Sequence, residues 1–155
     1  MNLWRISARS DLEGLGGEKA DGRWHTAARG KRIVYLSEHP ALALIEVLAN
    51  VHGDPRFFPD SYQLLKIATQ PRESIPTVAD ELGEDWRNDL AATRSLGDAW
   101  LEARSSALLA VPSVPAPEST NYLLNPLHPD AATLKIEWAR WIQHDARIFQ
   151  LLRSR

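Results

Sequence analysis

Cysteine is absent from the 155-residue chain, and this absence excludes several classes of chemistry at once. Without it the chain has no disulfide, no thiolate nucleophile and no cysteine-bound zinc site, which fits a reducing compartment. The chain also lacks an excess of cations, since 18 Lys and Arg are balanced by 20 Asp and Glu. A nucleic-acid footprint spread over the surface is therefore not expected.

Long hydrophobic runs are missing as well. No apolar stretch approaches the roughly 18 to 20 residues needed to cross a bilayer, and the first ten residues lack the apolar core of a signal peptide. A hydrophobic share of 44% and a charged share of 25% are ordinary for a globular chain. Because no internal repeat or low-complexity tract is present, we expect one cytoplasmic domain over residues 1–155.

Predicted strands outnumber predicted helices. Short β-branched, apolar or aromatic runs bounded by polar residues, glycine or proline predict strands at 3–6, 33–36, 62–68, 107–111, 134–138 and 148–152. Residues 13–22 contain four glycines and predict an irregular loop. Since strands and helices do not alternate regularly, the pattern favours a single-domain α+β fold with a mixed β-sheet core and flanking helices.

The strongest helix signal begins at Ser37. Its hydroxyl suits a capping position, an acid follows in the first turn, and Pro40 comes early, so we expect a helix that ends near Gly53. Two shorter helices are predicted at 84–90 and 98–104.

The helix after Ser37 is the most informative element of the sequence. At about 100° per residue, six apolar side chains form a wide arc of it: Leu42, Leu44, Ile45, Val47, Leu48 and Val51. Ala43, Glu46 and Asn50 occupy the narrow remaining sector. That sector is either the solvent side of the helix or the wall of a cleft in which the Glu46 carboxylate has a chemical role, and both interpretations stay open.

Three further side chains occupy positions that suit ligand binding. Tyr35 lies near the end of the strand before this helix, where it offers a flat ring and a hydroxyl. Arg23 follows the glycine-bearing loop, and Arg5 interrupts an apolar strand. Each has a structural alternative: a half-buried sheet tyrosine, a surface arginine after a turn, and an arginine in an ion pair.

Residues 111–129 carry five prolines, which fix the backbone of a segment that we expect to be irregular. Such a rigid loop would hold Ser113, Asn121 and Asn125 in place at low entropic cost, and loops of this kind commonly build sites. A purely structural crossing loop is the alternative.

Several common site motifs do not occur. The five histidines show no HExxH or other tight ligand spacing, so no metal site is expected. The stretch at 14–17 lacks the lysine of a phosphate-binding loop, and neither a GxGxxG fingerprint nor a GxSxG elbow is present.

Several ordered pieces of the chain carry a family resemblance: Trp4-Arg5, Gly22-Arg23-Trp24, Tyr35-Leu36-Ser37, residues 41–48 and 97–100, Val111-Pro112-Ser113, the stretch 121–129 and residues 144–149. Taken together they resemble the RES domain family, the toxin half of RES-Xre toxin–antitoxin modules. The resemblance spans nearly the whole chain, and its most specific parts are 111–113 and 121–129. Two positions depart from the pattern: His25 stands where asparagine is more usual, and Ala146 where proline is more usual.

The resemblance implies a fold similar to the diphtheria-toxin type of ADP-ribosyltransferase and an activity that consumes NAD as substrate, without a metal. Members of the family either cleave the nicotinamide–ribose bond, with water or phosphate as acceptor, or transfer ADP-ribose to a protein. By motif, the family's arginine, tyrosine and glutamate fall on Arg23, Tyr35 and Glu46, and its loop serine falls on Ser113.

These implied roles agree with the chemistry of the bond. Because nicotinamide is a good cationic leaving group, the ribose develops oxocarbenium character, which the Glu46 carboxylate would stabilise. Tyr35 would stack on nicotinamide, and Arg23 with Arg5 would bind the pyrophosphate. Ser113 would hydrogen-bond the nicotinamide amide or a ribose hydroxyl. Asn121 is a further candidate for NAD binding.

Three functions of different class follow. They are an NAD-degrading toxin, a protein ADP-ribosyltransferase that uses the same cleft, and a non-enzymatic binding domain with a rigid proline loop. The resemblance also implies an Xre-type antitoxin that occludes the cleft and carries the DNA binding, so that this chain itself contacts neither nucleic acid nor membrane. A homodimer is a further expectation from the family.

Overall fold

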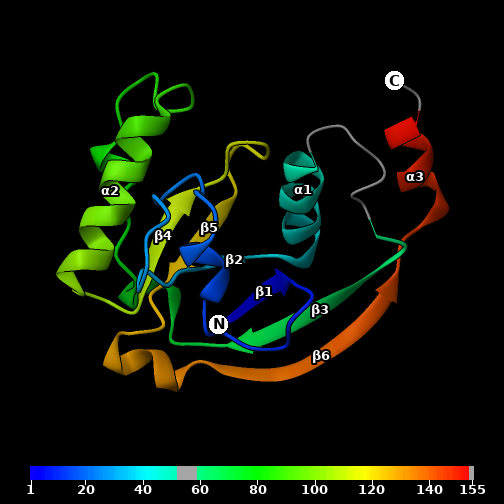
Figure 1. Cartoon of the computed structure of the whole chain (residues 1–155), viewed down its shortest axis with the longest axis horizontal. Helices are drawn as coiled ribbons and strands as arrows, with labels where there is room; N and C mark the ends of the chain where they lie inside the picture. The colour runs from blue at the N-terminus through cyan, green and yellow to red at the C-terminus, as the bar shows by residue number, and fades with distance from the viewer. Residues whose placement is uncertain (52–58, 154–155) are drawn as a thin grey trace.

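The computed structural model describes residues 1–51 and 59–153. Along these residues the elements follow in the order β1 (Asn2–Ile6), β2 (Val34–Ser37), α1 (Pro40–Asn50), β3 (Ser61–Ala68), α2 (Leu90–Ala103), β4 (Leu108–Pro112), β5 (Thr120–Leu124), β6 (Lys135–Gln143) and α3 (Ala146–Arg153), as Figure 1 shows. The glycine-bearing loop contains a short 3-10 turn at Leu15–Glu18.

The six strands form one sheet in the order β4-β5-β2-β1-β3-β6, and neighbouring strands are antiparallel. Within the described residues the parallel pairing is confined to an isolated bridge between Thr77 and Ala110. β1 and β2 pair only at Trp4 and Ser37, whereas β1 and β3 pair over five positions. The sheet therefore consists of two three-stranded halves that separate beyond a single point of contact.

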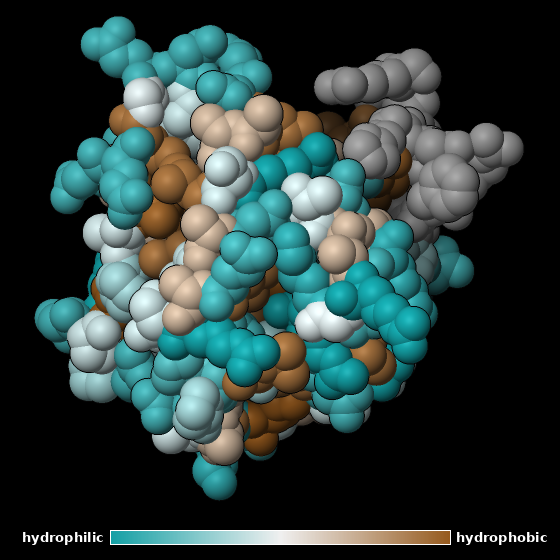
Figure 2. Space-filling view, turned by 60° about the vertical axis from the view of Figure 1, so that its left-hand side comes forward, coloured by the Kyte–Doolittle hydropathy of each residue, from teal (hydrophilic) through white to brown (hydrophobic). Residues whose placement is uncertain are grey.

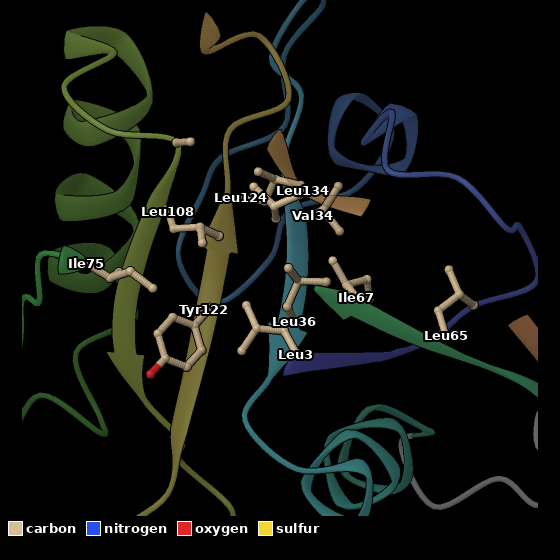
Figure 3. Packing of buried hydrophobic residues seen from close by; sticks show 11 residues of the cluster. Leu3, Val34, Leu36, Leu65, Ile67, Ile75, Leu108, Tyr122, Leu124 and Leu134 are labelled. Atoms are coloured by element: carbon tan, nitrogen blue, oxygen red, sulfur yellow. The ribbon is translucent and has the colours of Figure 1, made fainter. Parts of the chain in front are cut away.

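One face of the sheet carries the larger apolar cluster (Figure 3). Strand alternation directs side chains from both halves of the sheet toward it. The fully buried members are Leu3, Val34, Leu36, Leu65, Ile67, Leu108, Tyr122 and Leu124. Because both halves contribute, this cluster fixes the halves relative to each other even though β1 and β2 barely pair.

Helix α2 covers the opposite face of the β4-β5-β2 half, at the left of Figure 1. Its Trp100 and Leu101 pack with residues of β4 and β5, and with Trp24 from the loop before β2. Tryptophans 24 and 100 are thus core residues, at 2% and 7% exposure. Two of the six tryptophans of the chain therefore contribute to the packing between α2 and the sheet.

The segment 22–26 is hydrogen-bonded to α2 by the adjacent residues Thr93 and Arg94 and by Asp98, one turn further along the helix. These bonds run from Thr93 Oγ1 to the Arg23 carbonyl (2.9 Å), from Arg94 Nε to the Gly22 carbonyl (2.8 Å), and from the Thr26 amide to Asp98 Oδ1 (2.9 Å). Between them Gly97 lies directly against the Trp24 carbonyl, where a Cβ would overlap the oxygen. The helix therefore fixes the backbone that leads into β2.

The predicted α+β fold is confirmed, although the sheet is antiparallel and not mixed as expected, and most predicted elements lie within a few residues of those observed. The strands expected at 3–6, 33–36, 62–68 and 107–111 correspond to β1, β2, β3 and β4. The strand expected at 134–138 is β6, which continues to Gln143. The predicted helix start near Pro40 is also correct, although its expected end at Gly53 lies outside the described residues.

Several predictions of local structure are wrong. Residues 148–152 lie in α3 instead of a strand, since Asp145 Oδ1 accepts from the Arg147 amide and starts a helical turn. The cap of α1 is His39, whose Nδ1 accepts from the Ala41 amide, while Ser37 belongs to β2. In both places a side-chain acceptor two residues before the amide determines where the helix begins.

The remaining errors concern the boundaries of α2 and the missed strand β5. Residues 84–89 form turns, and α2 begins at Leu90 with Asp89 as its cap, so the two predicted short helices correspond to turns and to the second half of one helix. β5 lies within the proline-rich segment that we expected to be irregular throughout. Its apolar residues at 122–124 pair on both sides, with β2 and with β4.

The surface in Figure 2 is mostly hydrophilic, and hydrophobic residues emerge in separate patches. The exposed large apolar residues come from different elements and include Ile45, Leu127, Trp141 and Leu151. Among the described residues, no helix combines the length and apolar character that spanning a membrane requires.

The contact between Gly97 and the Trp24 carbonyl predicts that replacing this helical glycine by alanine lowers the stability of the protein instead of raising it. At a solvent-exposed position inside a helix, Gly→Ala stabilises the protein by up to about 1 kcal/mol. Gly97→Ala should instead destabilise by roughly 1–3 kcal/mol, because the added methyl overlaps backbone that cannot move away. Chemical denaturation measures the change, and Gly83→Ala, where a Cβ meets open space, is the control. A more stable Gly97→Ala protein would contradict the packing.

Candidate active site

A cleft of about 340 Å³ opens where β1 and β2 separate. β1, β2, α1 and β5 contribute to its walls, and the glycine-bearing loop contributes Gly16, Gly17 and residues 20–22. The volume falls within the range of small-molecule sites, which is about 300–1,000 Å³. The lining from the four elements includes Trp4, Arg5, Tyr35, Ser37, Glu46 and Asn121.

Glu46 lies on the cleft side of α1. Ala43 and Asn50, which share its narrow helical sector, line the same cleft, so the sector is a cleft wall. The apolar arc is less buried than its pattern suggests, since Ile45 is 41% exposed. Glu46 Oε1 accepts from Ser113 Oγ at 2.7 Å and from Asn121 Nδ2 at 2.6 Å.

The two donors to Glu46 are themselves held in place. Ser37 Oγ donates to Asn121 Oδ1 at 2.9 Å, which turns the Asn121 amide nitrogen toward Glu46. The Ala116 amide donates to Ser113 Oγ at 3.2 Å, so the Ser113 proton is directed to the carboxylate. Ser37, Ser113 and Asn121 are all buried. Within 1–51 and 59–153 no hydrogen bond is made by Glu46 Oε2, which remains available to a ligand.

Tyr35 contributes its ring to the cleft. Its hydroxyl lies on the loop side of the site, 3.1 Å from the Trp24 amide and 2.8 Å from His25 Nδ1. Burial is the main reason that the pKa of Tyr35 is raised well above its ordinary value, and the hydrogen bond from the Trp24 amide acts in the opposite direction. The phenol is therefore neutral across the physiological range.

Arg5 is the guanidinium that lines the cleft. Burial lowers its pKa, and the nearby Asp11 charge partly offsets this effect. Arg5 Nη1 donates to the Asp11 carbonyl at 3.3 Å, and among residues 1–51 and 59–153 its other donors have no hydrogen-bond partner, so that they could bind an anion. A planar fork of N–H groups in a cleft suits phosphate or carboxylate recognition.

Arg23 lies elsewhere. Its Nη2 donates to the carbonyls of Trp86 and Arg87 at 2.7 Å each, and its guanidinium lies over the Trp86 ring, 5.7 Å from the centroid. Arg23 is not among the residues that line the cleft. The structure thus brings together Glu46, Tyr35, Arg5 and Asn121, with Ser113 behind Glu46, and leaves Arg23 holding the turn that precedes α2.

Trp4, His25 and Ser37 are among the cleft residues that sequence reasoning did not predict as site residues. Trp4 packs edge-on against Trp138 from β6, with ring centroids 5.6 Å apart. A tryptophan beside Arg5 was visible in the sequence, but its place at the cleft depends on where β1 leaves β2. No cluster of three or more metal-ligating side chains occurs in the part of the chain that the structure describes.

A family model and several curated relatives match nearly the whole chain. The RES domain family matches residues 2–148. A Pseudomonas putida protein named Toxin Res is 41% identical, with 96% of this chain and all of that protein covered. A Sphingobium protein named Prs ADP-ribosylating toxin is 34% identical, with 96% and 97% covered.

One solved structure has a similar fold across almost the whole chain. It is the crystal structure of the M. tuberculosis MbcT-MbcA toxin-antitoxin complex, matched with a TM-score of 0.64 at 18% identity. The match covers 99% of this chain and 89% of that one. At this identity the likeness concerns the fold.

The raised pKa of Tyr35 predicts how stability depends on alkaline pH. The unfolded chain releases the phenol proton near pH 10, before the folded chain does, so the free energy of unfolding should fall as pH rises above about 10. Tyr35→Phe should reduce that fall without abolishing it, because burial also raises the pKa of Tyr122. Denaturation across an alkaline pH series measures the slope, and identical slopes in the two proteins would contradict the burial of the Tyr35 hydroxyl.

Proposed function

The chain belongs to the RES domain family, and on that premise we propose that it is a toxin that consumes NAD by cleaving the nicotinamide–ribose bond. Relatives matched over nearly their full length are named toxins. One of them is named for ADP-ribosylation, a reaction that takes its ADP-ribose from NAD. In a cell such a toxin would deplete cytoplasmic NAD and arrest growth.

The observation that carries the proposal is the geometry of Glu46. One carboxylate oxygen is held by Ser113 and Asn121, and the other is available in a cleft that also contains an aromatic ring and a guanidinium. Cleavage of the glycosidic bond needs a fixed negative charge beside a ribose that becomes positive. A carboxylate that is already oriented needs little reorganisation when that charge develops.

The proposed reaction uses the chain's own groups at each step. The bond between ribose C1′ and the nicotinamide nitrogen breaks, and its electron pair neutralises the pyridinium. Glu46 stabilises the oxocarbenium-like ribose, and water or phosphate then adds at C1′ and releases a proton. Tyr35 stacks on the nicotinamide ring and holds the bond in a reactive orientation. No metal takes part in these steps.

In this proposal Arg5, which lines the cleft, binds the pyrophosphate through charge-assisted hydrogen bonds. The motif also predicts this role for Arg23, but the geometry gives that prediction no support, because the Arg23 guanidinium contacts backbone carbonyls away from the cleft lining. Ser113 and Asn121 act in this proposal mainly by orienting Glu46. Asn121 also lines the cleft, and in this proposal it is a further contact to NAD.

Protein ADP-ribosylation is the second candidate function. The name of the Sphingobium relative favours it, and the same cleft and transition state would serve a macromolecular acceptor. Incubation of the pure protein with labelled NAD, with and without phosphate and with cell extract, separates the candidates. Free ADP-ribose or its 1″-phosphate supports NAD degradation, and label on a protein band supports transfer. Intact NAD under all conditions favours a non-enzymatic binding domain.

We also propose that an antitoxin of the Xre type occludes the cleft. The MbcT-MbcA structure, which shares the fold, is a toxin-antitoxin complex, and this supports an antitoxin partner. The slightly negative formal charge of −2 agrees with leaving DNA binding to that partner. A homodimer, expected from the family, is tested by the mass of the pure protein in solution.

Glu46→Gln tests the proposed role of the carboxylate. The amide oxygen of glutamine can still accept from Ser113 and Asn121, so folding and NAD binding should persist. Loss of the negative charge should reduce the rate of NAD cleavage by about 10²-fold or more. Steady-state kinetics measures this loss, with Glu81→Gln, an exposed residue outside the cleft, as the matched control. An unchanged rate for Glu46→Gln would remove Glu46 from the mechanism.

Arg5→Ala and Arg23→Ala distinguish the two arginines. Arg5→Ala should raise the KM for NAD by roughly 10- to 100-fold, the range expected for lost hydrogen bonds to a charged group. Arg23→Ala should chiefly lower the melting temperature, because its bonds run to the Trp86 and Arg87 carbonyls. A raised KM with unchanged stability in Arg23→Ala would restore Arg23 to the binding site and show that the guanidinium changes partner when NAD binds.

A further inference from the structure

His25 lies behind Tyr35 at the edge of the cleft and is 2% exposed. Its Nε2 lies 3.0 Å from the Gly17 carbonyl, and its Nδ1 lies 2.8 Å from the Tyr35 hydroxyl. The two rings are tilted by 50° with centroids 5.7 Å apart, so the imidazole meets the phenol at its oxygen and not across its face. The imidazole thus connects the glycine-bearing loop to β2.

The partners of His25 determine the direction of each hydrogen bond. A carbonyl oxygen only accepts, so the Gly17 contact places the imidazole proton on Nε2. In the neutral ring Nδ1 is then an acceptor, and the Tyr35 hydroxyl must donate to it. The Trp24 amide donates to the same hydroxyl oxygen at 3.1 Å. The one proton of the Tyr35 hydroxyl is therefore already committed to His25.

The backbone around the hydroxyl leaves it little room to move. A Cβ on Gly22 would overlap the Tyr35 oxygen, so the phenol tip lies directly against the Gly22 backbone. Arg94 and Thr93 on α2 bind the carbonyls of Gly22 and Arg23, which prevents this backbone from moving away. The hydroxyl of Tyr35 is thus anchored, and because Tyr35 lines the cleft, its ring is the part left to contact a ligand.

We propose that His25 is a positioning residue, which holds the Tyr35 ring in the cleft through the phenol, and that Tyr35 acts on substrate through its ring face alone. The proposal rests on the proposed NAD cleavage and assigns roles within the same site. The proposal assigns different roles to the two parts of Tyr35. The hydroxyl holds the ring in position through His25 and the Trp24 amide, and the ring stacks on nicotinamide.

A set of single and double variants tests this division of roles. His25→Ala and Tyr35→Phe both remove the His25–Tyr35 hydrogen bond and keep the ring, so each should lower kcat by a similar factor of roughly 3 to 10. The double variant should lose no more than either single variant, since the two residues act through one bond. Tyr35→Leu, which removes the ring, should lose about 10²-fold or more.

The conservative replacement and a matched control sharpen the test. His25→Asn can place Oδ1 where Nδ1 was, and it should recover most of the kcat that His25→Ala loses. His128→Asn is the control, because His128 Nδ1 also accepts a hydrogen bond, from the Asp130 amide, but lies outside the cleft. The losses should fall on kcat more than on KM, because a loosened ring misaligns the reacting bond while the anion contacts persist.

Two kinetic outcomes would overturn the proposal. If Tyr35→Phe is as damaging as Tyr35→Leu, the hydroxyl itself contacts substrate. If the losses of His25→Ala and Tyr35→Phe multiply in the double variant, the two residues act independently and His25 does not work through Tyr35.

Nitrogen-15 spectroscopy of the imidazoles supplies a readout that needs no activity. The His25 signal, assigned by its disappearance in His25→Asn, should show a proton on Nε2 and none on Nδ1 at neutral pH. A proton on Nδ1 would overturn the hydrogen-bond arrangement whatever the kinetics show. Failure of the wild-type protein to consume NAD would overturn the proposed function instead, and the two failures are thus distinguishable.

Discussion

The single pairing of Trp4 with Ser37 is the constraint on which the site depends. Strands that pair over their full length leave no space between them, because neighbouring strands lie about 4.8 Å apart. Here β1 leaves β2 after one pair, and the separation exposes side chains of both strands to a common cleft. The larger apolar cluster, which lies on the face of the sheet opposite α2 and includes residues from both halves, keeps the two halves together despite that gap.

Buried polar groups arranged in donor–acceptor chains then give the cleft its geometry. One chain runs from Ser37 through Asn121 to Glu46, and a second runs from the Trp24 amide through Tyr35 and His25 to the Gly17 carbonyl. A buried polar atom that loses its partner costs about 1–3 kcal/mol, so each chain resists rearrangement. Each chain includes a residue that lines the cleft, Glu46 in the first and Tyr35 in the second.

Helix α2 lies outside the cleft and nevertheless determines part of it. Its side chains hold the backbone of 22–26, and Gly97 allows that backbone to approach the helix closely. The segment carries His25 and borders the tip of Tyr35. The cleft therefore depends on packing between elements that lie some 70 residues apart in the sequence, such as Thr93 and Arg23.

The sequence alone determined the α+β class, most strands, the start of α1 and the family resemblance, because alternation, early proline and ordered motifs are local signals. It also identified Glu46, Tyr35, Arg5, Ser113 and Asn121 as candidates. Only the tertiary structure decided that the narrow sector of α1 is a cleft wall, that Arg23 binds the Trp86 and Arg87 carbonyls, and that His25 anchors Tyr35. Periodicity defines which residues share a face of an element, whereas the partner of that face depends on contacts between residues distant in the chain.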